Sequence, residues 1–86
     1  MAKVEVYTAD YCPYCTKAKV LLSTKGVEFT EIDITNDDEE RIKLVEKAGG
    51  MRTIPQVFIN DQHVGGFDNL NELNEKGELD TLLAGQ

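Results

Sequence analysis

The two cysteines of the chain are separated by only two residues, in the segment CPYC at positions 12–15. Cysteines at this spacing can form a structural disulfide, supply half of a metal site or act as a redox-active dithiol. A disulfide here would close a very short loop and gain about 2 kcal/mol of loop entropy, against about 4.7 kcal/mol for a 100-residue loop. Structural zinc would need further Cys or His ligands, and only His63 is available. A redox dithiol is therefore the favoured interpretation.

The position of the pair predicts different roles for its two sulfurs. Cys12 stands where a helix is predicted to begin, and Pro13 suits the first helical turn because its missing N–H is not needed there. The free N–H groups of that turn point at the Cys12 sulfur and stabilise its thiolate. Cys15 lies one turn deeper on an apolar side, so we expect burial to raise its pKa. We predict that Cys12 attacks and leaves from mixed disulfides, and that Cys15 resolves them.

Alternating apolar residues predict four strands, at residues 3–8, 27–34, 56–60 and 63–66. A turn at Asn60 and Asp61 makes the last two an antiparallel hairpin. The first two are separated by a predicted helix, which implies a right-handed crossover between parallel strands. We therefore expect an α/β fold in which helices cover a small mixed sheet.

Helical periodicity predicts three helical regions, at residues 14–25, 37–48 and 68–83. The second begins in an acidic run, and its buried stripe is predicted to be Ile42, Val45 and Ala48. Asp68 is predicted to cap the third region, which bends or breaks at Gly77.

Length and composition fit one small globular domain over residues 1–86. The net charge is -7 and the Lys and Arg residues are scattered, so nucleic acid is not an expected partner. The amino end alternates apolar and charged residues, unlike a signal peptide, and no apolar run is long enough to span a membrane. We expect a cytoplasmic monomer that binds neither a metal nor a membrane.

Three segments together resemble the dithiol glutaredoxins of bacteria: CPYC at 12–15, TIP at 53–55 and GGFDN at 65–69. They occur in the order of that family, in a chain of its length, and the resemblance covers essentially the whole sequence. Thioredoxins, in contrast, have Gly-Pro between their cysteines. The resemblance implies a thioredoxin fold with a four-stranded mixed sheet, and glutathione as the reductant and co-substrate.

The resemblance also implies which residues bind glutathione beside the Cys12 sulfur: Tyr14, Arg52, Thr53, Ile54, Pro55, Gly66, Phe67, Asp68 and Asn69. It implies that the bond before Pro55 is cis and that the Ile54 backbone pairs with the cysteinyl unit of glutathione. Arg52 is expected to meet the glycyl carboxylate, and Tyr14 is expected to line the groove.

The helix start after Gly65 is expected to bind the other end of glutathione. There the N–H groups of Gly66, Phe67 and Asp68 can hold the γ-glutamyl carboxylate, while Asp68 or Asn69 meets the ammonium group.

The chain departs from the family pattern near its reactive centre. Many glutaredoxins have a lysine three residues before the first cysteine, where this chain has Ala9 followed by Asp10. Lys17 is either a partial substitute for that cation or a solvated surface lysine. Phe67 stands where many relatives have cysteine, and Met51 borders the predicted groove in sequence.

The resemblance implies an enzyme that reduces glutathionylated proteins and protein disulfides with glutathione. Two alternatives stay open. One is an electron donor reduced by thioredoxin reductase, with ribonucleotide reductase as a partner. The other is a carrier in which Cys12 residues of two subunits and two glutathiones hold a [2Fe-2S] cluster, although relatives that hold clusters often lack a proline at the position of Pro13.

Overall fold

The sheet contains four strands, as the sequence predicts. In the computed structural model, which describes residues 3–84, they are β1 (Val4–Thr8), β2 (Thr30–Asp33), β3 (Gln56–Ile59) and β4 (Gln62–Gly65). Their order is β2-β1-β3-β4, with β1 parallel to β2 and antiparallel to β3, and with β4 antiparallel to β3. The predicted mixed sheet is confirmed, whereas residues 1–2 and 85–86 of the predicted domain lie outside the described part.

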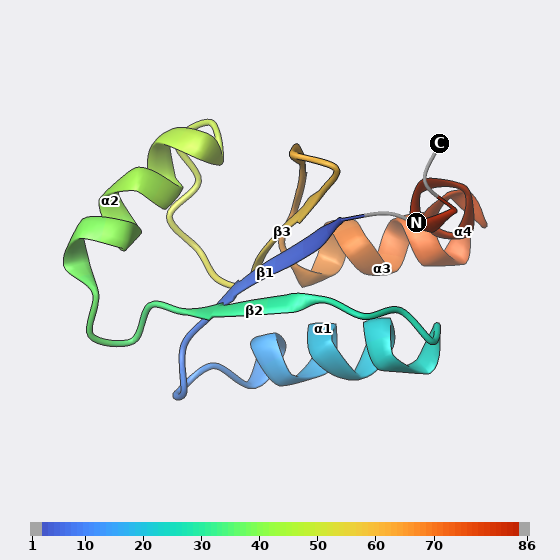
Figure 1. Cartoon of the computed structure of the whole chain (residues 1–86), viewed down its shortest axis with the longest axis horizontal. Helices are drawn as coiled ribbons and strands as arrows, with labels where there is room; N and C mark the ends of the chain where they lie inside the picture. Colours follow the sequence, from blue (N-terminus) through green and yellow to red (C-terminus); the bar gives the residue numbers. More distant parts are fainter. Residues whose placement is uncertain (1–2, 85–86) are drawn as a thin grey trace.

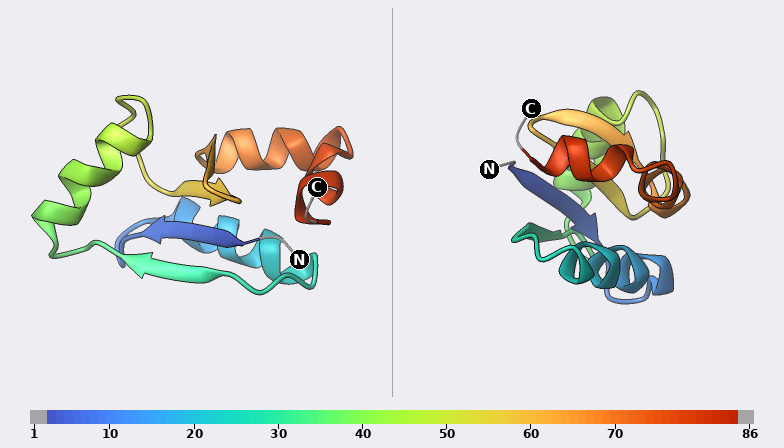
Figure 2. Two further views of the ribbon diagram at one scale, coloured as in Figure 1. Left: turned by 45° about the horizontal axis from the view of Figure 1, so that its top comes forward. Right: turned by 90° about the vertical axis from the view of Figure 1, so that its right-hand side faces the viewer.

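Within residues 3–84, four helices flank the sheet: α1 (Pro13–Thr24), α2 (Asp38–Lys47), α3 (Phe67–Glu75) and α4 (Glu78–Leu83). Figure 1 shows α1 beneath the β1–β2 side, α3 and α4 together near the chain ends, and α2 standing apart from them. The left view of Figure 2 also shows α2 at the end of the molecule away from α3 and α4. The predicted break of the last helical region is confirmed at Gly77, whose φ of 77° interrupts the helix.

The two faces of the sheet carry separate apolar clusters, because side chains alternate along each strand. Val6 and Val57 face α1, α3 and α4, where they pack against Leu22, Leu70 and other buried residues. The cluster on the opposite face contains Tyr7, Ile34, Phe58 and Leu44. Leu44 belongs to α2, so this helix covers that face. The β1–α1 turn therefore follows the C-terminal end of an inner strand, in a sheet that is packed on both faces.

The second strand is shorter than predicted. It begins at Thr30, so Val27 and Phe29 precede it and pack against the larger cluster as partly buried side chains. The physical reason lies in the end of α1, where Gly26 has a φ of 72° and the Val27 N–H donates to the Leu22 carbonyl at 3.3 Å. That bond closes the helix and removes the Val27 N–H from strand pairing.

Two details of the helices were predicted wrongly. Leu44 and Ala48 are the buried positions of the second region, Val45 is half-buried and Ile42 is exposed. The buried pair is spaced i, i+4, so the stripe passes through Leu44 instead of Ile42. The cap of α3 is Gly66, not Asp68, because the Asn69 side chain reaches back to accept the Gly66 N–H at 3.1 Å.

Candidate active site

The Cys12 sulfur lies at the start of α1 and makes two hydrogen bonds. It accepts from the backbone N–H of Cys15 at 3.3 Å, and its thiol donates to the carbonyl oxygen of Ile54 at 3.5 Å. Cys12 is the residue that caps α1, and Pro13 is the first residue of the helix, as predicted. A helix start carries N–H groups without intrahelical partners, so it favours a negative charge on this sulfur.

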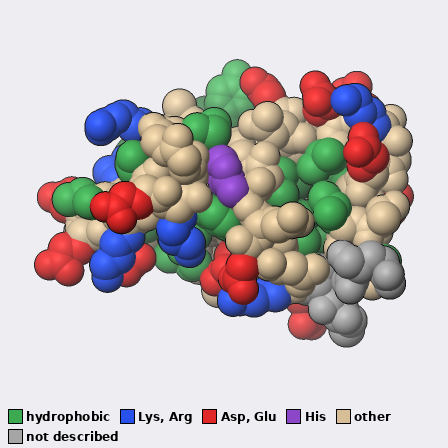
Figure 3. Space-filling view, turned by 90° about the horizontal axis from the view of Figure 1, so that it is seen from above, with side chains coloured by type: hydrophobic (Ala, Val, Ile, Leu, Met, Phe, Trp, Pro, Cys, Tyr) green, Lys and Arg blue, Asp and Glu red, His purple; other side chains and the backbone are tan. Residues whose placement is uncertain are grey.

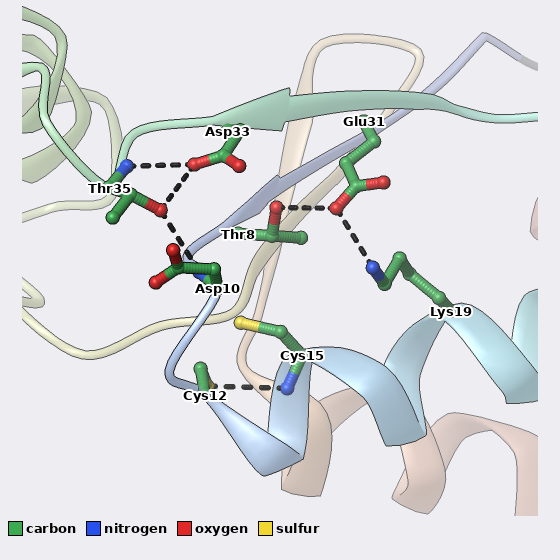
Figure 4. A network of polar contacts seen from close by, with 8 residues as sticks. All are labelled: Thr8, Asp10, Cys12, Cys15, Lys19, Glu31, Asp33 and Thr35. Atoms are coloured by element: carbon green, nitrogen blue, oxygen red, sulfur yellow. Dashed lines mark hydrogen bonds and ion pairs between the residues drawn. The ribbon is translucent and has the colours of Figure 1, made fainter.

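Cys15 is almost completely buried, with 1% of its surface exposed, beside Ala18 and Leu22 of the same helix. Burial, followed by its hydrogen bond with the Cys12 side chain, raises the pKa of the Cys15 thiol from 9.0 to about 12. Figure 4 shows its side chain extending from α1 on the side that faces β1 and β2. Both cysteines are free thiols, one half-buried and one buried, which is the asymmetry that the sequence predicts.

The turn that carries Cys12 is held by a short polar chain from β2. The Asp10 N–H donates to the Thr35 hydroxyl at 2.9 Å, and that hydroxyl donates to the Asp33 carboxylate (Figure 4). Within the turn, the Cys12 N–H donates to the Ala9 carbonyl at 3.2 Å. These bonds fix the backbone that precedes the helix start. Ala9 itself is buried, with 5% of its surface exposed.

A second polar group ties α1 to the sheet. Glu31 of β2 accepts from the Lys19 ammonium at 2.9 Å and from the buried Thr8 hydroxyl at 2.7 Å (Figure 4). The hydrogen bond from Lys19, then that from Thr8, lowers the pKa of Glu31. The helix that presents both cysteines is thereby fixed to β1 and β2 by a charge-assisted contact.

A cavity of about 330 Å³ joins three separate segments of the chain beside the reactive turn. It is lined by Tyr14, Met51, Thr53, Ile54, Pro55, Gly66, Phe67, Asp68 and Asn69. Eight of these residues are among the nine predicted to bind glutathione, and Met51 takes the place of Arg52, which does not line the cavity. A larger hollow of about 540 Å³ lies at the C-terminal end of α1, near Gly26, and so is remote from the helix start that carries Cys12.

The wall nearest Cys12 comes from the segment before β3. The Ile54–Pro55 bond is cis, as the family resemblance implies, and the Ile54 carbonyl is the acceptor of the Cys12 thiol. Pro55 itself is buried. This segment therefore contacts the reactive sulfur and also lines the cavity.

The outer wall is aromatic. Tyr14 is 52% exposed, and its ring centroid lies 6.2 Å from that of Phe67. The Lys17 ammonium lies 5.0 Å from the centre of the Tyr14 ring, a cation–π contact. Lys17 is exposed and packs on Tyr14 at the rim of the cavity.

Two kinds of site are not observed in the described residues. Within residues 3–84, no group of three or more His, Cys, Asp or Glu side chains is arranged to hold a metal ion. No helix in that range is long and apolar enough to cross a membrane.

A four-stranded mixed sheet with CxxC at the start of its first helix and a cis-proline beside the outer sulfur defines a thiol–disulfide oxidoreductase of the thioredoxin fold. The family model described as glutaredoxin matches residues 4–64. The chain belongs to the glutaredoxin family.

Curated relatives and solved structures agree with this membership. The chain is 48% identical over 83 residues to glutaredoxin 3 of Escherichia coli K12, covering 96% of this chain and 99% of that protein. It is 52% identical over 83 residues to a probable glutaredoxin of Synechocystis, covering 96% of this chain and 76% of the relative.

Among solved structures, glutaredoxin from Brucella melitensis superposes with a TM-score of 0.86 at 48% identity, covering 96% of this chain and 89% of that one. The complex of buckwheat glutaredoxin with glutathione superposes with a TM-score of 0.89 at 29% identity, covering 98% and 78%.

Proposed function

We propose that this protein is a glutathione-dependent thiol–disulfide oxidoreductase that reduces protein–glutathione mixed disulfides and protein disulfides, with Cys12 as nucleophile and Cys15 as resolving thiol. The observation that carries the proposal is the Cys12 sulfur, hydrogen-bonded by a helix-start N–H and placed against the Ile54 segment that lines the cavity. The glutathione complex of the buckwheat relative supports the choice of thiol.

In the glutathione cycle, the Cys12 thiolate attacks the glutathione sulfur of a mixed disulfide. A bond forms between Cys12 and glutathione, the protein–glutathione bond breaks, and the protein thiolate leaves and takes a proton from water. A second glutathione thiolate then attacks the bound glutathione sulfur, which releases oxidised glutathione and the Cys12 thiolate. The helix-start N–H stabilises Cys12 each time it leaves, which speeds the second step.

For a protein disulfide, Cys12 first joins one substrate sulfur and releases the other as a thiolate. Cys15 then loses its proton to water and attacks Cys12, which frees the substrate and closes a disulfide within the CPYC segment. Two glutathione molecules reduce that disulfide and become oxidised glutathione. Because burial raises the pKa of Cys15, its thiol stays protonated in the free reduced protein, which leaves the first attack to Cys12.

The cavity supplies contacts for each part of glutathione. The Ile54 carbonyl accepts a hydrogen bond from the Cys12 thiol in the free protein. Once Cys12 is a thiolate, the same carbonyl can accept a hydrogen bond from the cysteinyl N–H of glutathione. At the start of α3, Asn69 engages the Gly66 N–H, so the N–H groups of Phe67 and Asp68 remain to bind the γ-glutamyl carboxylate, and the Asp68 carboxylate meets the ammonium group.

The side of the cavity toward α2 binds the other end of glutathione. Arg52 reaches the glycyl carboxylate from the rim, between the two cavity-lining residues Met51 and Thr53, and Tyr14 and Phe67 form the apolar wall. The protein acts as a monomer in the cytoplasm, where the glutathione pool keeps thiols reduced.

The test is a comparison of reductants. Purified protein is incubated with a glutathionylated peptide and NADPH in two separate assays. One assay contains glutathione and glutathione reductase, the other contains thioredoxin reductase, and NADPH consumption is followed in both. We expect turnover with glutathione only. Turnover with thioredoxin reductase alone would favour the electron-donor alternative, with ribonucleotide reductase as the next substrate to assay. A visible absorption band after anaerobic purification would favour the cluster carrier.

A further inference from the structure

Gln56 is a fully buried polar residue directly after the cis-proline. It is the first residue of β3, and 0% of its surface is exposed. Its side-chain Nε2 donates to the Thr53 carbonyl at 2.8 Å and to the Thr53 hydroxyl at 3.3 Å. Because a carbonyl oxygen can only accept, these contacts fix which end of the amide faces Thr53.

The other end of the amide needs a donor, and His63 supplies it. With Nε2 turned to Thr53, the Gln56 Oε1 faces His63 Nε2 at 2.6 Å, so this histidine nitrogen carries the proton. His63 comes from β4, where it lies opposite Phe58, and its ring packs on Phe58 with centroids 5.1 Å apart. Figure 3, in which the single histidine is purple, shows it reaching the surface on this face of the molecule.

We propose that Gln56 and His63 form a positioning pair that holds Thr53 and Ile54 in place at the glutathione cavity. Thr53 and Ile54 both line that cavity, and the Ile54 carbonyl contacts the Cys12 thiol. A continuous series of hydrogen bonds and one peptide link therefore connects edge strand β4 to the segment beside the reactive sulfur. The identity of the ligand as glutathione rests on the proposed function, whereas the Gln56–His63 pair rests on the contacts described above.

The pair also contributes to stability, because every buried side-chain N or O atom in the described residues has a hydrogen-bond partner. A test of a positioning role must therefore separate substrate binding from stability. Removing His63 alone leaves the Gln56 oxygen buried without a donor, which lowers stability whatever else the pair does. Replacing both residues by apolar ones removes that penalty but also removes the contact with Thr53. Binding and stability are therefore separable.

Four variants make the test: His63→Leu, His63→Gln, the double variant Gln56→Met with His63→Leu, and Gln62→Leu. His63→Gln keeps a donor close to the position of Nε2, whereas His63→Leu does not. Gln62 is an exposed neighbour on the same strand and gives the matched control. Each variant is assayed for kcat and for KM with a glutathionylated peptide, and for its thermal unfolding midpoint.

We expect His63→Leu to raise KM about 3- to 10-fold with kcat within about twofold of wild type, as for a loss of substrate binding. The double variant should recover most of the unfolding midpoint but keep the raised KM. His63→Gln and Gln62→Leu should stay within about twofold of wild type in both parameters. A double variant that recovers a wild-type KM would overturn the proposal, as would an unchanged KM in His63→Leu.

A second readout separates this inference from the proposed function. If wild-type protein does not turn over with glutathione, the proposed function fails, and NMR spectra of the same variants still decide on the pair. We expect slowly exchanging Gln56 side-chain N–H signals in wild type and His63→Gln. In His63→Leu these signals should exchange rapidly, and the Thr53 and Ile54 amide shifts should move. Unmoved Thr53 and Ile54 shifts would contradict a positioning role.

Discussion

The backbone N–H of Cys15 donates a 3.3 Å hydrogen bond to the Cys12 sulfur. This bond makes one cysteine stabilise the charge on the other, because the donor is a helix-start N–H that the helix itself does not use. The Cys12 thiol also donates to the Ile54 carbonyl, so loss of the thiol proton frees that carbonyl to accept a hydrogen bond from a substrate. Activation of Cys12 and preparation of the adjoining cavity wall are thus linked.

Alkaline pH should destabilise the reduced protein through Cys15. Burial raises the pKa of this thiol to about 12 in the folded state, against 9.0 for an ordinary thiol. Between these values the unfolded chain has lost the proton and the folded chain keeps it. The resulting stabilisation is complete below pH 9.0 and is lost as pH rises toward 12.

Urea unfolding across this pH range under reducing conditions tests the prediction. Cys12→Ser is compared with Cys12→Ser/Cys15→Ala, so that no intramolecular disulfide can form. The free energy of unfolding of Cys12→Ser, relative to that of the double variant, should fall by about 1.4 kcal/mol per pH unit above the pKa of Cys15 in the unfolded chain. Parallel pH profiles for the two proteins would show that Cys15 titrates alike in the folded and unfolded states.

Gly65→Ala should impair glutathione binding as well as folding. Gly65 has a φ of 121°, and a Cβ there would collide with the amide group of Asn69, whose oxygen accepts the Gly66 N–H at the start of α3. Gly77 also has a positive φ, of 77°, but its Cβ position is open, so Gly77→Ala is the matched control. Each backbone strain costs about 1–2 kcal/mol of stability, and only the Gly65 change should also displace the start of α3.

We expect KM for the glutathionylated peptide to rise about 10-fold in Gly65→Ala and to stay within about twofold of wild type in Gly77→Ala. Thermal unfolding of both variants provides the stability correction. Equal KM values for the two variants would mean that the α3 start does not contact the substrate.

Arg52→Gln should weaken glutathione binding by removing a cation from the cavity rim. Arg52 is exposed and stands between Met51 and Thr53, which line the cavity, so its guanidinium can reach a carboxylate bound there. We expect a rise in KM of about 3- to 10-fold and a weaker dependence of KM on salt, since salt screens exposed charges. Lys43→Gln on α2, which removes an exposed charge paired with Glu40, is the control. An identical salt dependence in wild type and Arg52→Gln would remove Arg52 from the binding site.

Local patterns predicted the parts of this molecule that depend on local structure. Alternation gave the four strands, and the context of CPYC gave an outer Cys12 and a buried Cys15. The cis bond before Pro55 came from the family resemblance, because most X–Pro bonds are trans and nothing in the segment itself indicates the isomer.

Contacts between distant side chains have no such local signal. The burial of Leu44 instead of Ile42 depends on how α2 crosses the sheet, which periodicity does not specify when both residues are apolar. The Gln56–His63 bond joins adjacent strands, whereas the sequence shows His63 only as a hairpin residue and as a lone histidine without the further ligands that zinc needs. Met51, which stands beside the predicted groove in the sequence, does line the cavity.

The roles of the two cysteines are tested most directly by the glutathione-dependent reduction of a glutathionylated peptide by Cys12→Ser and by Cys15→Ser. We predict that Cys12→Ser loses at least about 99% of turnover, since the attacking sulfur is gone, while Cys15→Ser keeps a substantial part of it and loses reduction of protein disulfides. Full turnover by Cys12→Ser together with loss of turnover by Cys15→Ser would contradict the assignment of Cys12 as the nucleophile.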